Sequence, residues 1–142
     1  MIKRKVLFVC IHNSARSQMA ETFLNDLGKD GFTAYSAGLE PGKLNPYVVQ
    51  AMAEIGYDIS HNETNSVWDF IKKSDNFDTV ITVCDESSAE ACPIFPGNVK
   101  REHWSFADPS SFEGNEEEKL AFTKQVRDEI KQRITLWLSE QK

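Results

Sequence analysis

Two residues able to do chemistry, Cys10 and Arg16, stand at the two ends of a five-residue loop. The apolar run before Cys10 predicts a buried strand, and the pattern from Arg16 onward predicts a helix. Backbone N–H groups at a helix N-terminus converge on one point, where the peptide dipoles favour an anion. Arg16 adds a planar charged fork. We therefore expect an oxyanion cradle formed by Ile11, His12, Asn13, Ser14, Ala15 and Arg16.

Cys10 is the candidate nucleophile of this cradle. The positive surroundings favour its thiolate, which is the reactive form of a cysteine. Ser17 can donate a hydrogen bond to the sulfur, although a serine there also fits a helix cap. We interpret His12 as a loop residue, because a thiolate that is already formed needs no base. Asn13 tolerates left-handed backbone angles and fits a role in shaping the loop. The alternative is a buried cysteine beside a surface arginine.

Strand patterns alternate with helix patterns along the chain. Apolar and β-branched runs predict strands at residues 5–9, 32–37, 78–83 and 99–104. Helices are expected at 15–27, after Asn45-Pro46 as far as Gly56, at 66–73 and from Glu116 onward. This order predicts an α/β fold, a single doubly wound domain over residues 1–142. Its small four-stranded parallel sheet would carry helices on both faces and a phosphate-binding-type loop after the first strand.

Two further residues fall beside the expected cradle. Ligands of parallel sheets bind beyond the carboxyl ends of the strands. Cys10 follows the first strand, Cys84 follows the third, and Asp108 lies in the loop after the fourth. An aspartate before a proline is also a common turn former, so Asp108 has a structural alternative.

Composition limits the classes of partner. The chain has 142 residues, a net charge of −6 and three cysteines. The negative charge argues against nucleic acid and anionic membranes as partners. An odd number of cysteines does not fit a static disulfide framework. The charged start precedes only a short apolar run, so we expect no signal peptide and a cytoplasmic location.

The segment from Cys10 to Glu21, with Cys84, Cys92 and Asp108-Pro109, resembles the thioredoxin-coupled arsenate reductases. These share the fold of the low-molecular-weight protein tyrosine phosphatases. The similarity spans essentially the whole chain and extends to Tyr35-Ser36-Ala37-Gly38, Asn45-Pro46, Cys92-Pro93 and His103-Trp104.

The resemblance implies a role for each thiol. Cys10 would attack an arsenate held by Arg16, and Asp108 would protonate the departing oxygen. Cys84 would then attack Cys10, releasing arsenite. Cys92 would move the disulfide to Cys84–Cys92, which thioredoxin reduces. The relay requires no cofactor, because each step is thiolate exchange. The resemblance also implies a possible potassium ion near Asn13, Glu21 and Ser36.

The spacing between Cys84 and Cys92 is one residue longer than is usual in that family. Eight positions in a helix span about 12 Å, whereas bridged cysteine Cα atoms lie roughly 4.4–6.8 Å apart. We expect residues 85–91 to loop out or unwind when the bridge forms.

Two other functions stay open. A phosphatase would use the same cradle through a cysteinyl-phosphate. Against it, the phosphatases resembled here usually carry aromatic residues after Asp-Pro, where this chain has Ser110-Ser111, with Phe112 one place later. They also often have a second cysteine in the loop, where this chain has Ala15. A non-catalytic protein whose three thiolates bind As(III) is the third possibility.

Overall fold

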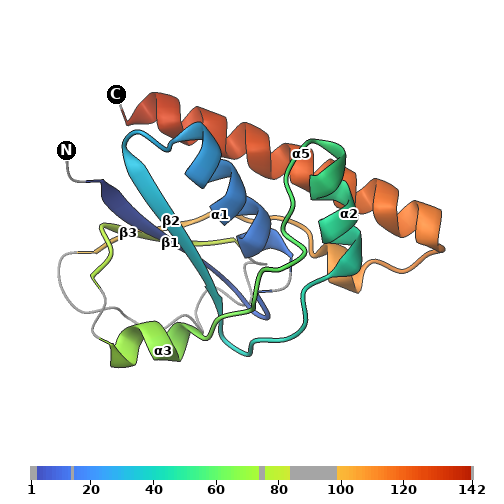
Figure 1. Ribbon diagram of the computed structural model, residues 1–142, viewed down its shortest axis with the longest axis horizontal. Coiled ribbons are helices and arrows are strands. Elements are labelled where there is room, and N and C mark those ends of the chain that lie inside the picture. The colour runs from blue at the N-terminus through green and yellow to red at the C-terminus, as the bar shows by residue number, and fades with distance from the viewer. Residues whose placement is uncertain (1–2, 14, 74–75, 84–98, 142) are drawn as a thin grey trace.

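A four-stranded parallel sheet in the order β2-β1-β3-β4 forms the centre of the molecule (Figure 1). The computed structural model describes residues 3–13, 15–73, 76–83 and 99–141. The strands are β1 (Arg4–Cys10), β2 (Phe32–Gly38), β3 (Thr79–Thr82) and β4 (Lys100–His103). The predicted α/β fold with a four-stranded parallel sheet is confirmed.

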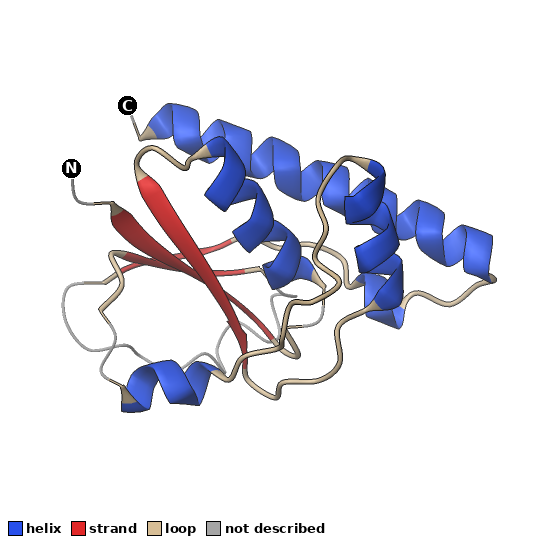
Figure 2. Ribbon diagram, viewed as in Figure 1, coloured by secondary structure: helices blue, strands red, loops and turns tan. Residues whose placement is uncertain are grey.

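Helices cover both faces of the sheet, as expected (Figure 2). One face carries α1 (Arg16–Leu27), α2 (Pro46–Glu54) and α5 (Glu116–Glu140), and the other carries α3 (Val67–Lys72). Side chains alternate along β1, so Val6 and Phe8 join the core under α1 and α5, whereas Leu7 and Val9 pack with Val67 of α3. A strand buried on both faces explains the continuous apolar run before Cys10.

The helix ends follow local signals. Asn45 caps α2 by accepting from the backbone N–H groups of Tyr47 and Val48, at 2.8 and 3.4 Å. The helix ends at Glu54, before Gly56. Asn115 and Glu118 form a capping box at the start of α5. The apolar stripe of α1 is buried at Met19, Ala20, Phe23 and Leu24, whereas Leu27 at the end of the helix is 42% exposed.

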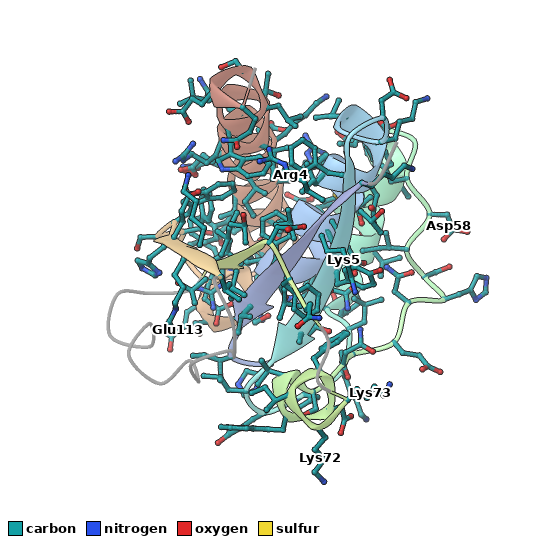
Figure 3. All side chains as sticks on the ribbon, turned by 90° about the vertical axis from the view of Figure 1, so that its left-hand side faces the viewer. Arg4, Lys5, Asp58, Lys72, Lys73 and Glu113 are labelled. Carbon is teal, nitrogen blue, oxygen red and sulfur yellow. The ribbon has the colours of Figure 1, made fainter. Side chains whose placement is uncertain are left out.

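The start of β1 lies beside the end of α5. Arg4 donates from Nη2 to Oε1 of Gln141 at 3.0 Å. On the α3 face, Lys72 points away from the sheet (Figure 3). No helix in the described ranges is long and apolar enough to cross a bilayer. The carboxyl ends of β1 and β2 lie at the opposite end, where the candidate site is found.

Candidate active site

Cys10 closes β1 and is 3% exposed. Its sulfur accepts a hydrogen bond from the backbone N–H of Asn13 at 3.2 Å and lies 2.9 Å from Oγ of Ser17. A thiolate can only accept, so Ser17 is the donor of that pair when the sulfur is ionised. Two donors aimed at one sulfur stabilise the charged form of a nucleophile.

Asn13 shapes the loop that holds these donors. Its φ of 55° lies in the left-handed region, the conformation that an asparagine tolerates. Its Nδ2 donates to Oγ of Ser17 at 2.7 Å. Its Oδ1 accepts from Nε2 of Gln18 at 3.3 Å and from the backbone N–H of Asn65 at 2.8 Å. Both polar atoms of the Asn13 side chain therefore have hydrogen-bond partners within the protein.

The start of α1 has the character of an anion site. The N-cap residue, Ala15, has no side-chain oxygen with which to cap the first N–H groups. The described first turn contains no acidic residue and begins with Arg16. The helix dipole and the guanidinium therefore favour negative charge at this end of the helix.

Arg16 and Asp108 meet beside the cradle. The Arg16 side chain is almost fully buried, and its Nη1 donates to the carbonyl of Phe106 at 3.0 Å. Its Nη2 lies 3.6 Å from Oδ2 of Asp108. Oδ1 and Oδ2 of this carboxylate also accept from Ser110 N–H and Ser111 Oγ, at 2.9 and 3.0 Å. Asp108 thus caps the 3₁₀ turn η1 (Pro109–Ser111) and also lies at the cradle.

The loop after β2 supports the cradle from outside. Backbone N–H groups of Leu39, Glu40 and Gly42 donate to the carbonyls of Cys10, Ile11 and His12, at 3.1, 2.7 and 3.0 Å. His12 Nδ1 lies 2.8 Å from the carbonyl of Glu40, so the ring is held against this loop.

A cleft of about 420 Å³ opens next to the cradle. Its lining includes His12 of the cradle, Tyr47 at the start of α2 and Phe112, which follows η1. The ring of Phe112 stacks on Phe122 of α5, with centroids 4.5 Å apart. Lys43 and Lys119 also line the cleft, which gives it a locally positive character in an acidic protein.

Glu21 and Ser36 offer oxygen atoms behind the cradle. Ser36 Oγ donates to Oε1 of Glu21 at 3.2 Å. Burial raises the pKa of Glu21 to about 7, although hydrogen bonds from Ser36 oppose the rise. A cation would offset this desolvation, so Glu21 and Ser36 fit a potassium ion. Asn13 fits less well, because its Oδ1 already accepts two hydrogen bonds. The described residues contain no cluster of three His, Cys, Asp or Glu side chains suited to a metal.

The predicted residues Ser14, Cys84 and Cys92 lie outside the described residues, as does the segment 85–91. Two other residues belong to the cradle although the sequence predicted no role for them. Gln18 is 1% exposed and donates to Asn13. The available sequence signal was a glutamine that directly follows the Arg16-Ser17 pair at the start of the helix. Gly38 approaches the backbone of the cradle loop at Ile11, His12 and Asn13 so closely that there is no room for a Cβ atom.

A model of the low molecular weight phosphotyrosine protein phosphatase family matches residues 5–142. An arsenate reductase of Bacillus licheniformis is 48% identical over 134 residues, covering 94% of each chain.

Two solved structures are also similar. An arsenate reductase in the phosphate-binding state is 31% identical, with a TM-score of 0.76 over 96% of this chain and 98% of that one. A thioredoxin-dependent arsenate reductase of Corynebacterium glutamicum is 28% identical, with a TM-score of 0.72 over 98% of this chain and 62% of that one. The chain therefore belongs to the low molecular weight phosphotyrosine protein phosphatase family, in the group formed with its arsenate reductase relatives.

Proposed function

We propose that this protein reduces arsenate to arsenite by a relay of three thiols, Cys10, Cys84 and Cys92. The observation that carries the proposal is the Cys10 sulfur at the end of β1, which has two hydrogen-bond contacts beside the start of α1, in a chain 48% identical to an arsenate reductase. A similar structure described in a phosphate-binding state supports a tetrahedral oxyanion as the ligand of this loop.

In the first step the Cys10 thiolate forms a sulfur–arsenic bond and one arsenic–oxygen bond breaks. Arg16 holds the remaining oxygens, and Asp108 gives its proton to the oxygen that leaves as water. The distance of 3.6 Å between Arg16 Nη2 and Asp108 Oδ2 supports this division of roles, because both groups can then reach one ligand. Arsenic is still As(V) in this adduct.

Cys84 then attacks the sulfur of Cys10. A Cys10–Cys84 disulfide forms, the sulfur–arsenic bond breaks, and its electron pair leaves with arsenic as arsenite. Cys92 attacks Cys84, which restores the Cys10 thiolate and leaves a Cys84–Cys92 disulfide. A dithiol protein of the thioredoxin class supplies the two electrons for the next cycle, in keeping with the similarity to a thioredoxin-dependent enzyme.

The direct test is turnover. Catalytic amounts of protein with thioredoxin, thioredoxin reductase and NADPH should oxidise many equivalents of NADPH, and only when arsenate is present. A protein that merely binds As(III) reduces no arsenate, so it would cause no arsenate-dependent oxidation of NADPH. No arsenate-dependent oxidation, together with rapid hydrolysis of an aryl phosphate, would refute the reductase proposal in favour of a phosphatase.

A weak phosphatase activity is the second candidate function. The cleft between Tyr47 and Phe112 favours it, because two aromatic rings beside the cradle suit the leaving group of an aryl phosphate. Arsenate and phosphate esters share the same tetrahedral shape. Hydrolysis of para-nitrophenyl phosphate, abolished by Cys10→Ser, would establish this activity, and equal hydrolysis by the variant would exclude it.

We also propose that a potassium ion can bind at Glu21 and Ser36. It would supply positive charge beside a half-buried carboxylate and stabilise the region behind the cradle. Potassium should raise the melting temperature of the parent protein more than that of Glu21→Gln, with lithium as the control cation. Equal shifts for both proteins would exclude the site.

A further inference from the structure

Gln18 is a buried polar residue that the relay chemistry does not use. It lies in the first turn of α1 and is 1% exposed. Its Nε2 is within 3.1 Å of the Asn13 carbonyl, 3.3 Å of Asn13 Oδ1 and 3.1 Å of the Glu63 carbonyl. Its Oε1 accepts from Nδ2 of Asn62 at 3.1 Å. Three acceptors thus share the two hydrogens of one amide, and the whole side chain is satisfied.

The main partner of Gln18 is the residue that sets the cradle. Asn13 has a left-handed backbone, and its N–H donates to the Cys10 sulfur. Its side chain donates to Ser17, whose hydroxyl is the second contact of that sulfur. Gln18 donates to both the backbone oxygen and the side-chain oxygen of Asn13. Rotation of either the backbone or the side chain of Asn13 would therefore break a hydrogen bond to Gln18.

The other partners of Gln18 connect the cradle to a distant part of the chain. Asn62 and the Glu63 carbonyl belong to a polar segment in which Asn65 also donates to Asn13. The same segment is tied to the end of β2, because Gly38 N–H donates to the carbonyl of Asn65 at 2.8 Å. The amide of Gln18 therefore links the strained loop to a segment that is itself attached to the sheet.

We propose that Gln18 is a positioning residue for the Cys10 nucleophile. It fixes Asn13 so that the Asn13 N–H and the Ser17 hydroxyl both meet the Cys10 sulfur. This role rests on the proposed function in one respect, that Cys10 is the nucleophile. It extends that function by assigning the stability of the Cys10 thiolate to an amide that does not touch the sulfur.

Asn25 provides a matched control on the same helix. It also joins α1 to backbone with two hydrogen bonds, donating to the Ala34 carbonyl at 3.1 Å and accepting from Ala34 N–H at 2.8 Å. These bonds support β2 away from the cradle. Loss of the Asn25 amide should lower stability without any effect on the reactivity of Cys10.

The test measures alkylation of Cys10 by iodoacetamide between about pH 5 and 10, in full-length protein carrying Cys84→Ser and Cys92→Ser. Gln18→Met keeps the length of the side chain and removes its donors. We expect its pH profile to move upward by about one unit, so that alkylation is about tenfold slower at pH values well below the midpoint of the parent profile. Asn25→Ala should keep the parent profile and melt at a lower temperature.

A Gln18→Met protein with the parent profile would overturn the proposal, whatever its melting temperature. If that variant does not fold, Asn62→Ala replaces it, because Asn62 is exposed and its loss frees Oε1 of Gln18. Its profile should move the same way by about half as much, and an unmoved profile would overturn the proposal. Alkylation of Cys10 needs no arsenate. Failure of the reductase assay would therefore refute the proposed function, while the alkylation profiles would still test the role of Gln18.

Discussion

Replacing Gly38 by alanine should damage the cradle without touching a catalytic group. A Cβ atom at this position would lie 2.8 Å from each of three backbone atoms: Asn13 N, the His12 carbonyl carbon and Ile11 O. All three belong to the loop that holds the Cys10 sulfur. The loop cannot simply swing away, because backbone hydrogen bonds of 2.7 to 3.1 Å tie it to residues 39–42.

The magnitude follows from the overlap. Favourable carbon contacts begin near 3.5 Å, so the loop backbone must retreat by about 0.7 Å. Overpacking of this kind costs roughly 1–3 kcal/mol, which for a chain of this size lowers the melting temperature by about 4–10 °C. Catalytic geometry tolerates displacements of about 0.5 Å, so we expect kcat/KM for arsenate to fall about 10- to 100-fold.

Gly31→Ala is the matched control, because a Cβ atom at Gly31 meets nothing within 4 Å. Thermal melting and the coupled NADPH assay should find Gly31→Ala within about 0.5 kcal/mol and twofold of the parent protein. Gly38→Ala that keeps both the parent melting temperature and the parent kcat/KM would refute the reasoning, since the close approach would then impose no constraint.

Three further predictions concern the charged groups. Arg16→Lys keeps the charge but loses the planar fork that reaches the Phe106 carbonyl and Asp108, so kcat/KM for arsenate should fall about 100-fold in steady-state assays. Asp108→Asn can still accept from Ser110 N–H but cannot give a proton. Its single-turnover rate should fall about 10²- to 10⁴-fold while phosphate affinity, measured by calorimetry, stays within about threefold. The pKa of Glu21 is about 7 in the folded protein and 4.5 in the unfolded chain, so the unfolded chain releases the Glu21 proton first as pH rises. The free energy of unfolding should therefore decline between pH 4.5 and about 7. Urea unfolding in potassium-free buffer should show that the free energy of unfolding falls by about 3 kcal/mol over this range because of Glu21. For Glu21→Gln the free energy of unfolding should depend less on pH.

Local patterns were enough to predict the elements around the cradle. The apolar run before Cys10 predicts a strand because β1 is covered on both faces. Asn45-Pro46 predicts the start of α2 because the Asn45 side chain really caps it. Topology then explains why Asp108, almost a hundred residues after Cys10 in the sequence, meets Arg16 at the same edge of the sheet.

The features of the site that local patterns did not predict depend on contacts between segments distant in the sequence. The polar stretch around Asn62 and Asn65 has no periodicity to interpret, yet both residues enter the hydrogen-bond network of the cradle through Gln18 and Asn13. The need for glycine at position 38 arises from a close approach of backbone that no single segment reveals. Leu27 continues the apolar stripe of α1 but lies at its end, beyond the core.

The order of the three thiols is the central claim, and disulfide mapping by mass spectrometry tests it most directly. Protein treated with arsenate in the absence of thioredoxin should contain a Cys84–Cys92 bridge, and the Cys92→Ser variant a Cys10–Cys84 bridge. Arsenite should be released once in both cases. Arsenite release with all three thiols still reduced, or a Cys84–Cys92 bridge that forms equally in Cys10→Ser, would contradict the relay.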